Sequence, residues 1–179
     1  MLKTLNTKNS IQAKRIMIFG RPGSGKSTFA HELHNITKIP LFHLDKYFYT
    51  SNWMQRDYAE FMKMQQEIVN NDTWIVDGNC TKSFETRYSR ADLCLYFNYP
   101  MIVCLWRVCK RLLQNRDHID DRAEDCPEIV RWQLIKYMWT FEDRVKDKIA
   151  ALQAKYHHVQ FIEVNNNAQA KSILQSIEA

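Results

Sequence analysis

Three of the four glycines in this chain fall within six consecutive residues. They belong to the string GRPGSGKS, residues 20–27, which fits the pattern G-x-x-x-x-G-K-[ST] at every required position. A short apolar run, residues 16–19, comes directly before this string, and apolar residues at helical spacing follow it. A buried strand, a glycine-rich loop and an amphipathic helix in this order predict a phosphate-binding loop, because backbone amides and a helix N-terminus together hold an anion.

The length and composition of the chain predict one compact domain. With 179 residues, of which 45% are apolar and 25% charged, the chain can bury roughly 70% of its unfolded surface without disulfides or a structural metal. It contains no run of about 18 uncharged apolar residues, so we expect no membrane-spanning helix and no membrane partner. Residues 1–14 lack the apolar stretch of a secretory signal, and we therefore expect a cytoplasmic protein.

The order of apolar segments predicts a sheet covered by helices. Residues 1–13 are polar and unpatterned, so we expect a flexible lead there and a single domain over residues 14–179. Strands that alternate with helices favour a parallel sheet with helices on both faces, a three-layer α/β sandwich. The strands are expected at residues 16–19, 41–44, 74–76, 93–99 and 159–164, and the helices at about 57–69, 101–114, 132–156 and 168–177.

Two of these helical segments carry more detailed predictions. The apolar residues of the helix at 101–114 that should face the core are Ile102, Leu105, Cys109 and Leu112. In the region after residue 131, one apolar face contains Trp132, Ile135 and Trp139. The apolar pattern changes phase near Thr140, and Asp143 follows three residues later. This predicts a break between two helices with a capping box at Thr140.

The cysteines and the net charge exclude some classes of site. None of the five cysteines forms a CxxC pair, which argues against a disulfide framework or a zinc site. Cys94, Cys104 and Cys109 lie among apolar residues and are interpreted as small core side chains. The formal charge of +5 suits a protein that handles phosphates, but no dense basic run indicates nucleic-acid binding.

The glycine-rich loop predicts a site for ATP with Mg²⁺. Lys26 would reach the β and γ phosphates, and Ser27 would place its hydroxyl on the metal. The residues expected to contact the nucleotide here are Gly20, Arg21, Pro22, Gly23, Ser24, Gly25, Lys26, Ser27 and Thr28.

Two aspartates close predicted strands, where ligands collect in open α/β sheets. Asp77 is the candidate metal ligand beside Ser27, because a carboxylate at the end of a neighbouring strand can hold Mg²⁺ directly or through water. Asp45 is the candidate residue for the phosphate acceptor, orienting its hydroxyl or acting as a general base. Either aspartate could instead cap a helix or a turn. His43 is interpreted as a satisfied histidine of a strand.

Arginines flank the polar segment at residues 114–127. Arg107 and Arg111 lie four residues apart on a predicted helix, so both leave one face just before this segment, and Arg122 lies within it. Phosphoryl transfer needs positive charge on the migrating group and exclusion of water, and arginines on a closing lid supply both. We therefore expect a lid at residues 114–127 and a catalytic role for these three arginines.

The chain resembles the family of DNA topology modulation proteins, which is similar to the adenylate-kinase-like P-loop kinases. The resemblance is carried by the strings GRPGSGKST, HLD, WIVDGN, RADLCLYFNYP, LWRVCKR and DCPE in this order, and it extends from about Lys14 to the C-terminus. It implies a five-stranded parallel sheet, an acceptor-binding region at about 46–70 and a lid after the fourth strand. It also implies that Arg107 and Arg111 touch the donor phosphates, and that Asn166 lies in a loop over the adenine ring.

The chain departs from true adenylate kinases in one string. Where those enzymes carry D-G-F-P-R, residues 77–81 read DGNCT, so the arginine that would clamp AMP is missing from its usual place. Arg87 or Arg90 could replace it. The resemblance therefore implies a kinase but leaves the acceptor open.

Three functions agree with these patterns. The first is a kinase that transfers the γ-phosphate of ATP to a small-molecule acceptor, such as a nucleoside, a nucleotide or another hydroxyl compound. The second is a nucleotide-dependent regulator of DNA topology that binds nucleic acid, which a salt-dependent gel shift would test. The third is an ATPase without an acceptor. The sequence is compatible with a monomer or a homodimer.

Overall fold

The computed structural model describes residues 11–50, 54–113 and 132–177. Five parallel strands form one sheet in the order β2-β3-β1-β4-β5. The predicted five-stranded parallel sheet is therefore confirmed. The strands are β1 (Arg15–Gly20), β2 (Leu41–His43), β3 (Trp74–Asp77), β4 (Leu93–Phe97) and β5 (Gln160–Val164).

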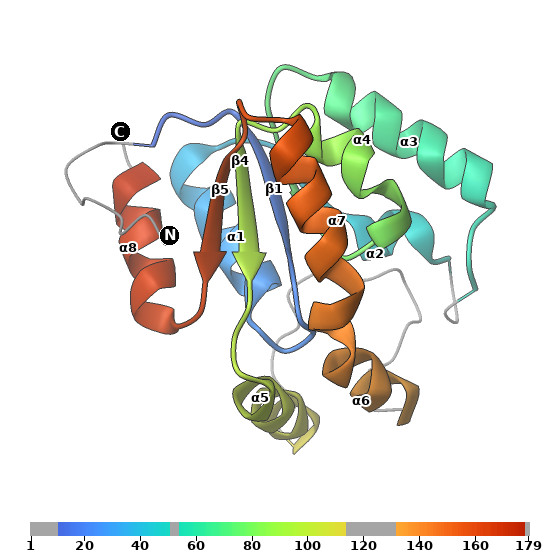
Figure 1. Ribbon diagram of the computed structural model, residues 1–179, viewed down its shortest axis with the longest axis vertical. Coiled ribbons are helices and arrows are strands. Elements are labelled where there is room, and N and C mark those ends of the chain that lie inside the picture. The colour runs from blue at the N-terminus through green and yellow to red at the C-terminus, as the bar shows by residue number, and fades with distance from the viewer. Residues whose placement is uncertain (1–10, 51–53, 114–131, 178–179) are drawn as a thin grey trace.

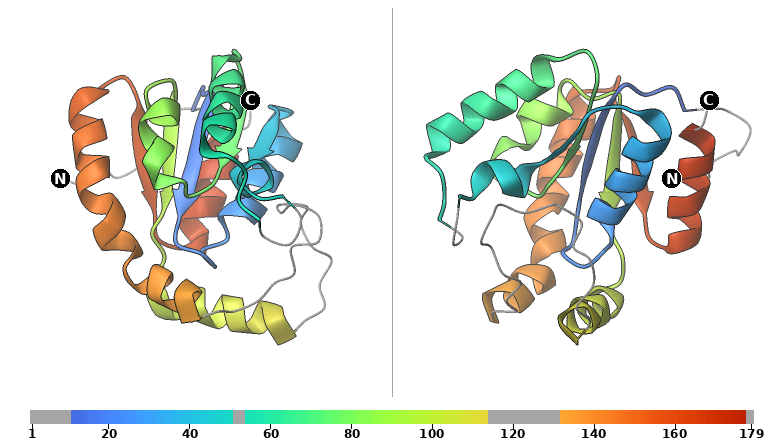
Figure 2. Two further views of the ribbon diagram at one scale, coloured as in Figure 1. Left: turned by 90° about the vertical axis from the view of Figure 1, so that its right-hand side faces the viewer. Right: turned by 180° about the vertical axis from the view of Figure 1, so that it is seen from behind.

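Helices cover both faces of this sheet, as Figure 1 and Figure 2 show. Alternate residues of each strand point to opposite faces, so Ile16 and Ile18 of β1 enter one core cluster, and Met17 and Phe19 enter the other. The first cluster packs against α1 (Lys26–Thr37) and α8 (Asn167–Ile177), and the second against α3 (Tyr58–Asn70), α4 (Phe84–Tyr88) and α7 (Phe141–Lys155). These layers form the predicted three-layer sandwich.

The second strand ends earlier than the sequence predicts. The strand β2 stops at His43, which pairs with Asp77 at the end of β3, and α2 (Leu44–Phe48) begins directly after it. Since β3 extends no further, the chain beyond His43 has no strand to pair with. Asp45 therefore lies in the first turn of α2 and not at the end of a strand.

The helix α5 (Met101–Leu113) exposes some of the residues expected to face the core. Ile102 is 76% exposed and Cys109 is exposed, so both predictions are wrong, whereas Cys104 and Val108 are buried. Apolar residues occur on every side of this helix, so the pattern alone does not select a face. The inward face is set by contact with the glycine-rich loop, where a side chain at Gly23 would meet Cys104 and Val108.

The predicted break at Thr140 separates α6 (Trp132–Trp139) from α7. The predicted capping box is wrong, because the Thr140 side chain caps no helix. Its hydroxyl donates to the Lys136 carbonyl at 3.0 Å and accepts from Arg144 Nε at 2.8 Å. The expected face of α6 is largely exposed, since Trp132 is 77% and Trp139 73% exposed.

The carboxyl ends of the strands are surrounded by the glycine-rich loop, α5 and α6 (Figure 1).

Residues 11–13 of the expected lead pack beside α8, since the Ile11 amide donates to the Ser176 carbonyl at 2.8 Å and Ala13 is buried in the first core cluster. The described helices include none that is both long and apolar enough to cross a bilayer. Residues 1–10 and the predicted lid at 114–127 lie outside the described residues.

Candidate active site

The glycine-rich loop leaves β1 and turns sharply into α1. Gly23 and Gly25 have φ angles of 80° and 92°, a region that side-chain-bearing residues rarely adopt. A Cβ atom at Gly23 would lie 2.5 Å from the backbone oxygen of Cys104, so only glycine allows α5 to pack this closely against the loop. Neighbouring residues are thus turned so that successive amides can face one side, as an anion-binding loop requires.

The N-terminus of α1 is available to an anion. Gly25 is its N-cap and provides no side chain to occupy the first amides, and the first turn contains no acidic residue. The positive end of the helix dipole therefore points into the loop together with Lys26, Ser27 and Thr28. This arrangement is the one that binds phosphate oxygens.

Arg21 turns its side chain away from the loop. Its guanidinium is buried and donates to the carbonyl oxygens of Tyr99 at 2.6 Å and Met138 at 3.0 Å, and it lies 3.6 Å from Glu142. The residue therefore ties the loop to the start of α5 and to the junction of α6 and α7. Only its backbone is left to contact a nucleotide.

Asp77 is a buried, ionised carboxylate at the end of β3. Its Oδ2 atom lies 3.0 Å from His43 Nδ1. Burial alone would raise the pKa of Asp77, but the His43 hydrogen bond, the charge of Lys26 and the Ser27 hydroxyl hold this pKa below its ordinary value. Its Oδ1 atom is buried without a hydrogen-bond partner among the residues that the structure describes.

These residues fit a magnesium ion. A buried carboxylate oxygen without a partner carries a large desolvation cost, which a cation beside it would offset. Mg²⁺ in nucleotide sites takes one or two protein ligands and fills its other positions with water and phosphate oxygens. Ser27 and Asp77 supply such a set. In the described part of the chain, no three or more His, Cys, Asp or Glu side chains form a group that could hold a metal ion by themselves.

Arg107 is placed directly on the loop. It donates from Nη1 to the Ser24 carbonyl and from Nη2 to Asn167 Oδ1, both at 2.8 Å, and its guanidinium lies 4.7 Å from the centre of the Tyr99 ring. Asn167 is the first residue of α8. The neighbouring Asn166, expected near the adenine ring, accepts from the Gln169 backbone amide at 3.0 Å through its side chain. Arg107 thus bridges α5, the glycine-rich loop and the first residue of α8.

The remaining predicted residues are less closely gathered. Arg111 lies one turn after Arg107 on α5, and Asp45 is an exposed residue of α2. Arg122 lies outside the described residues.

Neither arginine suggested as a substitute clamp faces the site. Arg87 is fully buried and donates to the carbonyl oxygens of Gly78 at 2.9 Å and Cys80 at 2.8 Å; burial lowers its pKa to about 10. Arg90 donates from Nε to the Val69 carbonyl near the C-terminus of α3, at the other end of the strands from the site. Arg87 is therefore a structural residue that holds the chain after β3.

The sequence analysis assigned no role in the site to two residues that the structure places there, His43 and Asn79. His43 holds Asp77, and Asn79 Oδ1 accepts from the Gly20 amide at 2.9 Å, so it fixes the start of the glycine-rich loop. Both lie at or just beyond the ends of β2 and β3. Their position at the ends of two predicted strands could have identified them, because polar side chains at the carboxyl ends of adjacent parallel strands lie close together.

Comparisons with known proteins support the fold. No protein-family model and no curated protein matches the chain. Among solved structures, it is similar to shikimate kinase from Acinetobacter baumannii in complex with shikimate, with a TM-score of 0.56, 17% identity and coverage of 92% of this chain and 90% of that one. A gluconokinase from Sinorhizobium meliloti 1021 gives a TM-score of 0.55, 11% identity and coverage of 92% and 91%. Together with the five-stranded sheet and the glycine-rich loop, these likenesses show that the chain has the α/β fold of the P-loop kinases.

Proposed function

We propose that this protein is a kinase that transfers the γ-phosphate of ATP to a hydroxyl group of a small molecule. One observation carries the proposal. The open N-terminus of α1 lies beside an ionised Asp77 whose buried Oδ1 has no partner among the described residues, and Lys26 and Ser27 belong to the same site. A triphosphate with its magnesium ion would satisfy the amides and the carboxylate together.

Each residue has a role in this reaction. The loop amides and Lys26 would bind the β and γ phosphates. Ser27 and Asp77 would hold Mg²⁺, which would supply positive charge beside the transferring group. Arg107, Arg111 and Arg122 add positive charge at the donor, and the segment 114–127 excludes water as a lid. Asp45 orients the acceptor hydroxyl and takes its proton. Asn166 and its neighbours form the loop next to the base.

The comparisons favour a small hydroxyl compound as acceptor. The similar solved structures are a shikimate kinase, a sugar kinase and a gluconokinase, and all have under 20% sequence identity to this chain. We further propose that the chain belongs to the adenylate-kinase-like branch that it resembles in sequence, acting in the cytoplasm on a soluble acceptor.

Replacing Lys26 tests the proposed function. ADP formation is followed with Mg²⁺-ATP and a panel of nucleosides, nucleoside monophosphates, hydroxy acids and sugars. We expect Lys26→Ala to lower turnover by about 100-fold or more, because it removes a cation from the transferring group. The control is Lys38→Ala, which removes a lysine just beyond the far end of α1. A folded Lys26→Ala variant that turns over at the rate of the control would refute the proposal.

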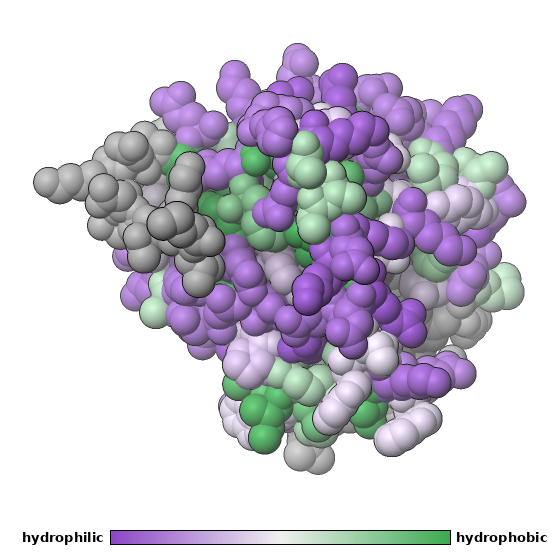
Figure 3. Space-filling model, in the orientation of Figure 1, coloured by the Kyte–Doolittle hydropathy of each residue, from purple (hydrophilic) through white to green (hydrophobic). Residues whose placement is uncertain are grey.

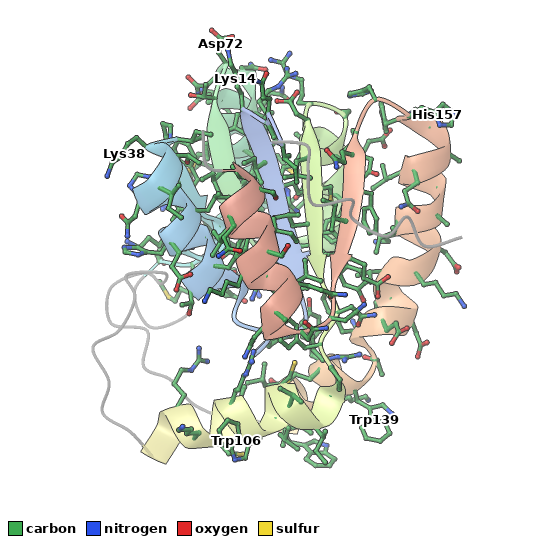
Figure 4. The ribbon with its side chains drawn as sticks, turned by 90° about the vertical axis from the view of Figure 1, so that its left-hand side faces the viewer. Lys14, Lys38, Asp72, Trp106, Trp139 and His157 are labelled. Carbon is green, nitrogen blue, oxygen red and sulfur yellow. The ribbon has the colours of Figure 1, made fainter. Side chains whose placement is uncertain are left out.

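A second candidate function is nucleic-acid binding by α5 and α6. These helices carry Arg107, Lys110, Arg111 and Lys136 and no acidic residue. Trp106 is 60% exposed with Lys110 4.8 Å from its ring centre, and Figure 3 and Figure 4 show this end of the molecule with exposed apolar residues and Trp106 and Trp139. Exposed rings beside cations can stack on bases. A gel shift of single-stranded DNA that weakens with salt and is lost in Trp106→Ala would support it; no shift at low salt would exclude it.

A further inference from the structure

The helices α5 and α6 lie across the carboxyl ends of the strands, and each has an inner and an outer face (Figure 1, Figure 2). The inner faces are packed, since Cys104 and Val108 of α5 and Met138 of α6 are buried in the first core cluster. These contacts attach both helices to the body of the molecule. The apolar side chains on the outer faces therefore have no part in the core.

The outer faces expose four large apolar side chains. Ile102 and Trp106 lie four residues apart on α5 and are 76% and 60% exposed, and Trp132 and Trp139 lie seven residues apart on α6 and are 77% and 73% exposed. Residues at these spacings share one face of a helix. Figure 4 shows Trp106 and Trp139 at the same end of the molecule, both pointing away from the sheet. Exposed apolar side chains gathered in this way mark an interaction surface.

The charged side chains of these two helices are all positive. They are Arg107, Lys110, Arg111 and Lys136, and neither helix contains an acidic residue. Arg107 turns inward to the Ser24 carbonyl, whereas Arg111 and Lys136 are exposed and Lys110 is half-buried. A partner that matches this outer face is therefore anionic and accepts apolar side chains.

An anionic lipid bilayer has both properties. Trp side chains are favoured at the boundary between headgroups and acyl chains, where the ring is in an apolar layer and the indole N–H reaches a polar one. Lys and Arg side chains are attracted by the negative surface of a leaflet that contains anionic lipids. Because α5 and α6 lie next to each other across one end of the molecule (Figure 2), they present these side chains together to a planar surface.

Two observations favour a bilayer over a nucleic-acid strand on this face. Lys110 Nζ lies 4.8 Å from the centre of the Trp106 ring, so one side of that ring is already covered and only the other can stack on a base. Ile102 is more exposed than Trp106 and has no ring to stack, but it can enter acyl chains. A second copy of the chain is a poorer partner, because two such faces would bring like charges together.

We propose that the outer face of α5 and α6 binds reversibly to an anionic lipid bilayer. Trp106 and Trp139 enter the interfacial layer, and Lys110, Arg111 and Lys136 lie beside the headgroups. Such peripheral binding needs no spanning helix. It goes beyond the proposed kinase function and does not depend on it, because the outer face lies opposite the face of α5 that contacts the glycine-rich loop.

This proposal departs from the expectation that the chain has no membrane partner. That expectation rested on the lack of a long apolar run, which concerns helices that cross a bilayer. Binding at the surface depends instead on which side chains the fold leaves exposed. The exposure of Trp132 and Trp139 becomes visible only in the folded chain.

Co-sedimentation with vesicles tests the apolar part of the proposal. The full chain is mixed with vesicles of phosphatidylcholine, with or without about one-third phosphatidylserine, while Mg²⁺ and a non-hydrolysable ATP analogue fill the glycine-rich loop. We expect binding about 10- to 100-fold tighter with phosphatidylserine, together with a blue shift of Trp fluorescence. Replacing both Trp106 and Trp139 by Ala should weaken it by about 10-fold or more. The control is Ile36→Ala, which removes an exposed apolar side chain of α1 and should leave binding unchanged.

A matched pair of charge reversals tests the electrostatic part. Lys136→Glu should weaken binding to phosphatidylserine vesicles by about 10-fold, whereas Lys146→Glu, at an exposed position of α7, should have a much smaller effect. Circular dichroism verifies that each variant is folded. No binding to either vesicle, equal binding to both, or equal effects of the two reversals would overturn the proposal.

Two other outcomes would assign the face to another partner and overturn the bilayer. These are binding of single-stranded DNA, or formation of a dimer, that is lost in the double Trp variant while vesicles are not bound. Phosphotransfer is measured separately. Its absence in a chain that binds vesicles would refute the kinase and leave the bilayer surface standing.

Discussion

The hydrogen bond between His43 and Asp77 orients the candidate metal ligand. Both side chains are buried, and the bond occupies Oδ2 of the carboxylate, so Oδ1 is the oxygen left for a cation. A ligand fixed by a neighbouring donor keeps its geometry in every binding event. In the proposed metal site, His43 would accordingly be a positioning residue that orients Asp77 and does not itself contact Mg²⁺.

Substitutions of His43 separate this role from simple packing. We expect His43→Leu to weaken the binding of Mg²⁺ by about 10- to 100-fold, because Asp77 loses the hydrogen-bond donor that orients it. His43→Asn should retain most of the affinity, since its amide nitrogen lies close to the place of Nδ1. The measurement is a Mg²⁺ titration of the nucleotide-bound protein, with circular dichroism to verify folding. Equal losses in the two folded variants would show that the hydrogen bond has no role.

The helix α5 acts as a second wall of the glycine-rich loop. Its buried residues Cys104 and Val108 lie against Gly23, and Arg107 on the same side donates to the Ser24 carbonyl. This contact determines which face of the helix points inward. Packing of α5 and the shape of the phosphate loop are therefore coupled.

A pair of substitutions on α5 tests its observed orientation. Val108→Ala should lower the free energy of unfolding by about 1–3 kcal/mol, because it leaves a cavity against the loop. Ile102→Ala should change it by less than about 0.5 kcal/mol, because the side chain is 76% exposed. Urea unfolding of both variants gives the comparison. A larger loss for Ile102→Ala would support the face expected from the apolar pattern instead.

In the whole molecule, the two ends of the parallel strands have different roles. The carboxyl ends hold the polar site, whereas at the amino ends Asp92 binds the start of β1. The Asp92 carboxylate accepts from the Arg15 amide at 2.9 Å and from Arg15 Nη2 at 2.6 Å. Burial would raise the pKa of Asp92, but the hydrogen bonds and charge of Arg15 lower it below the ordinary value.

Acid should therefore destabilise the fold by protonating Asp77 at the carboxyl ends of the strands and Asp92 at their amino ends. The pKa values of Asp77 and Asp92 are lower in the folded than in the unfolded chain, so their stabilisation is complete above the unfolded value, about 3.9, and is lost as the pH falls through the lower folded values. We expect Asp92→Asn to be less stable at pH 7 and to lose less stability on acidification below about pH 4. The control is Asp147→Asn, an exposed residue of α7. Urea unfolding between pH 7 and pH 3 measures both; parallel pH profiles for wild type and Asp92→Asn would contradict this account.

Local patterns in the chain were sufficient for the fold and for the phosphate loop. The string at residues 20–27 and the apolar runs before it and at the other strands are short-range signals, since backbone turns, helix starts and strand burial depend on neighbouring residues. They predicted the five parallel strands, the break at Thr140 and a candidate metal pair of Ser27 and Asp77.

Contacts between distant segments were decided by folding alone. The inward face of α5, the burial of Arg87 and the pairing of His43 with Asp77 depend on which elements meet in space, and no spacing along the chain encodes them. A local pattern specifies an element and its polarity, whereas the partner of a side chain is set by the packing of elements far apart in sequence.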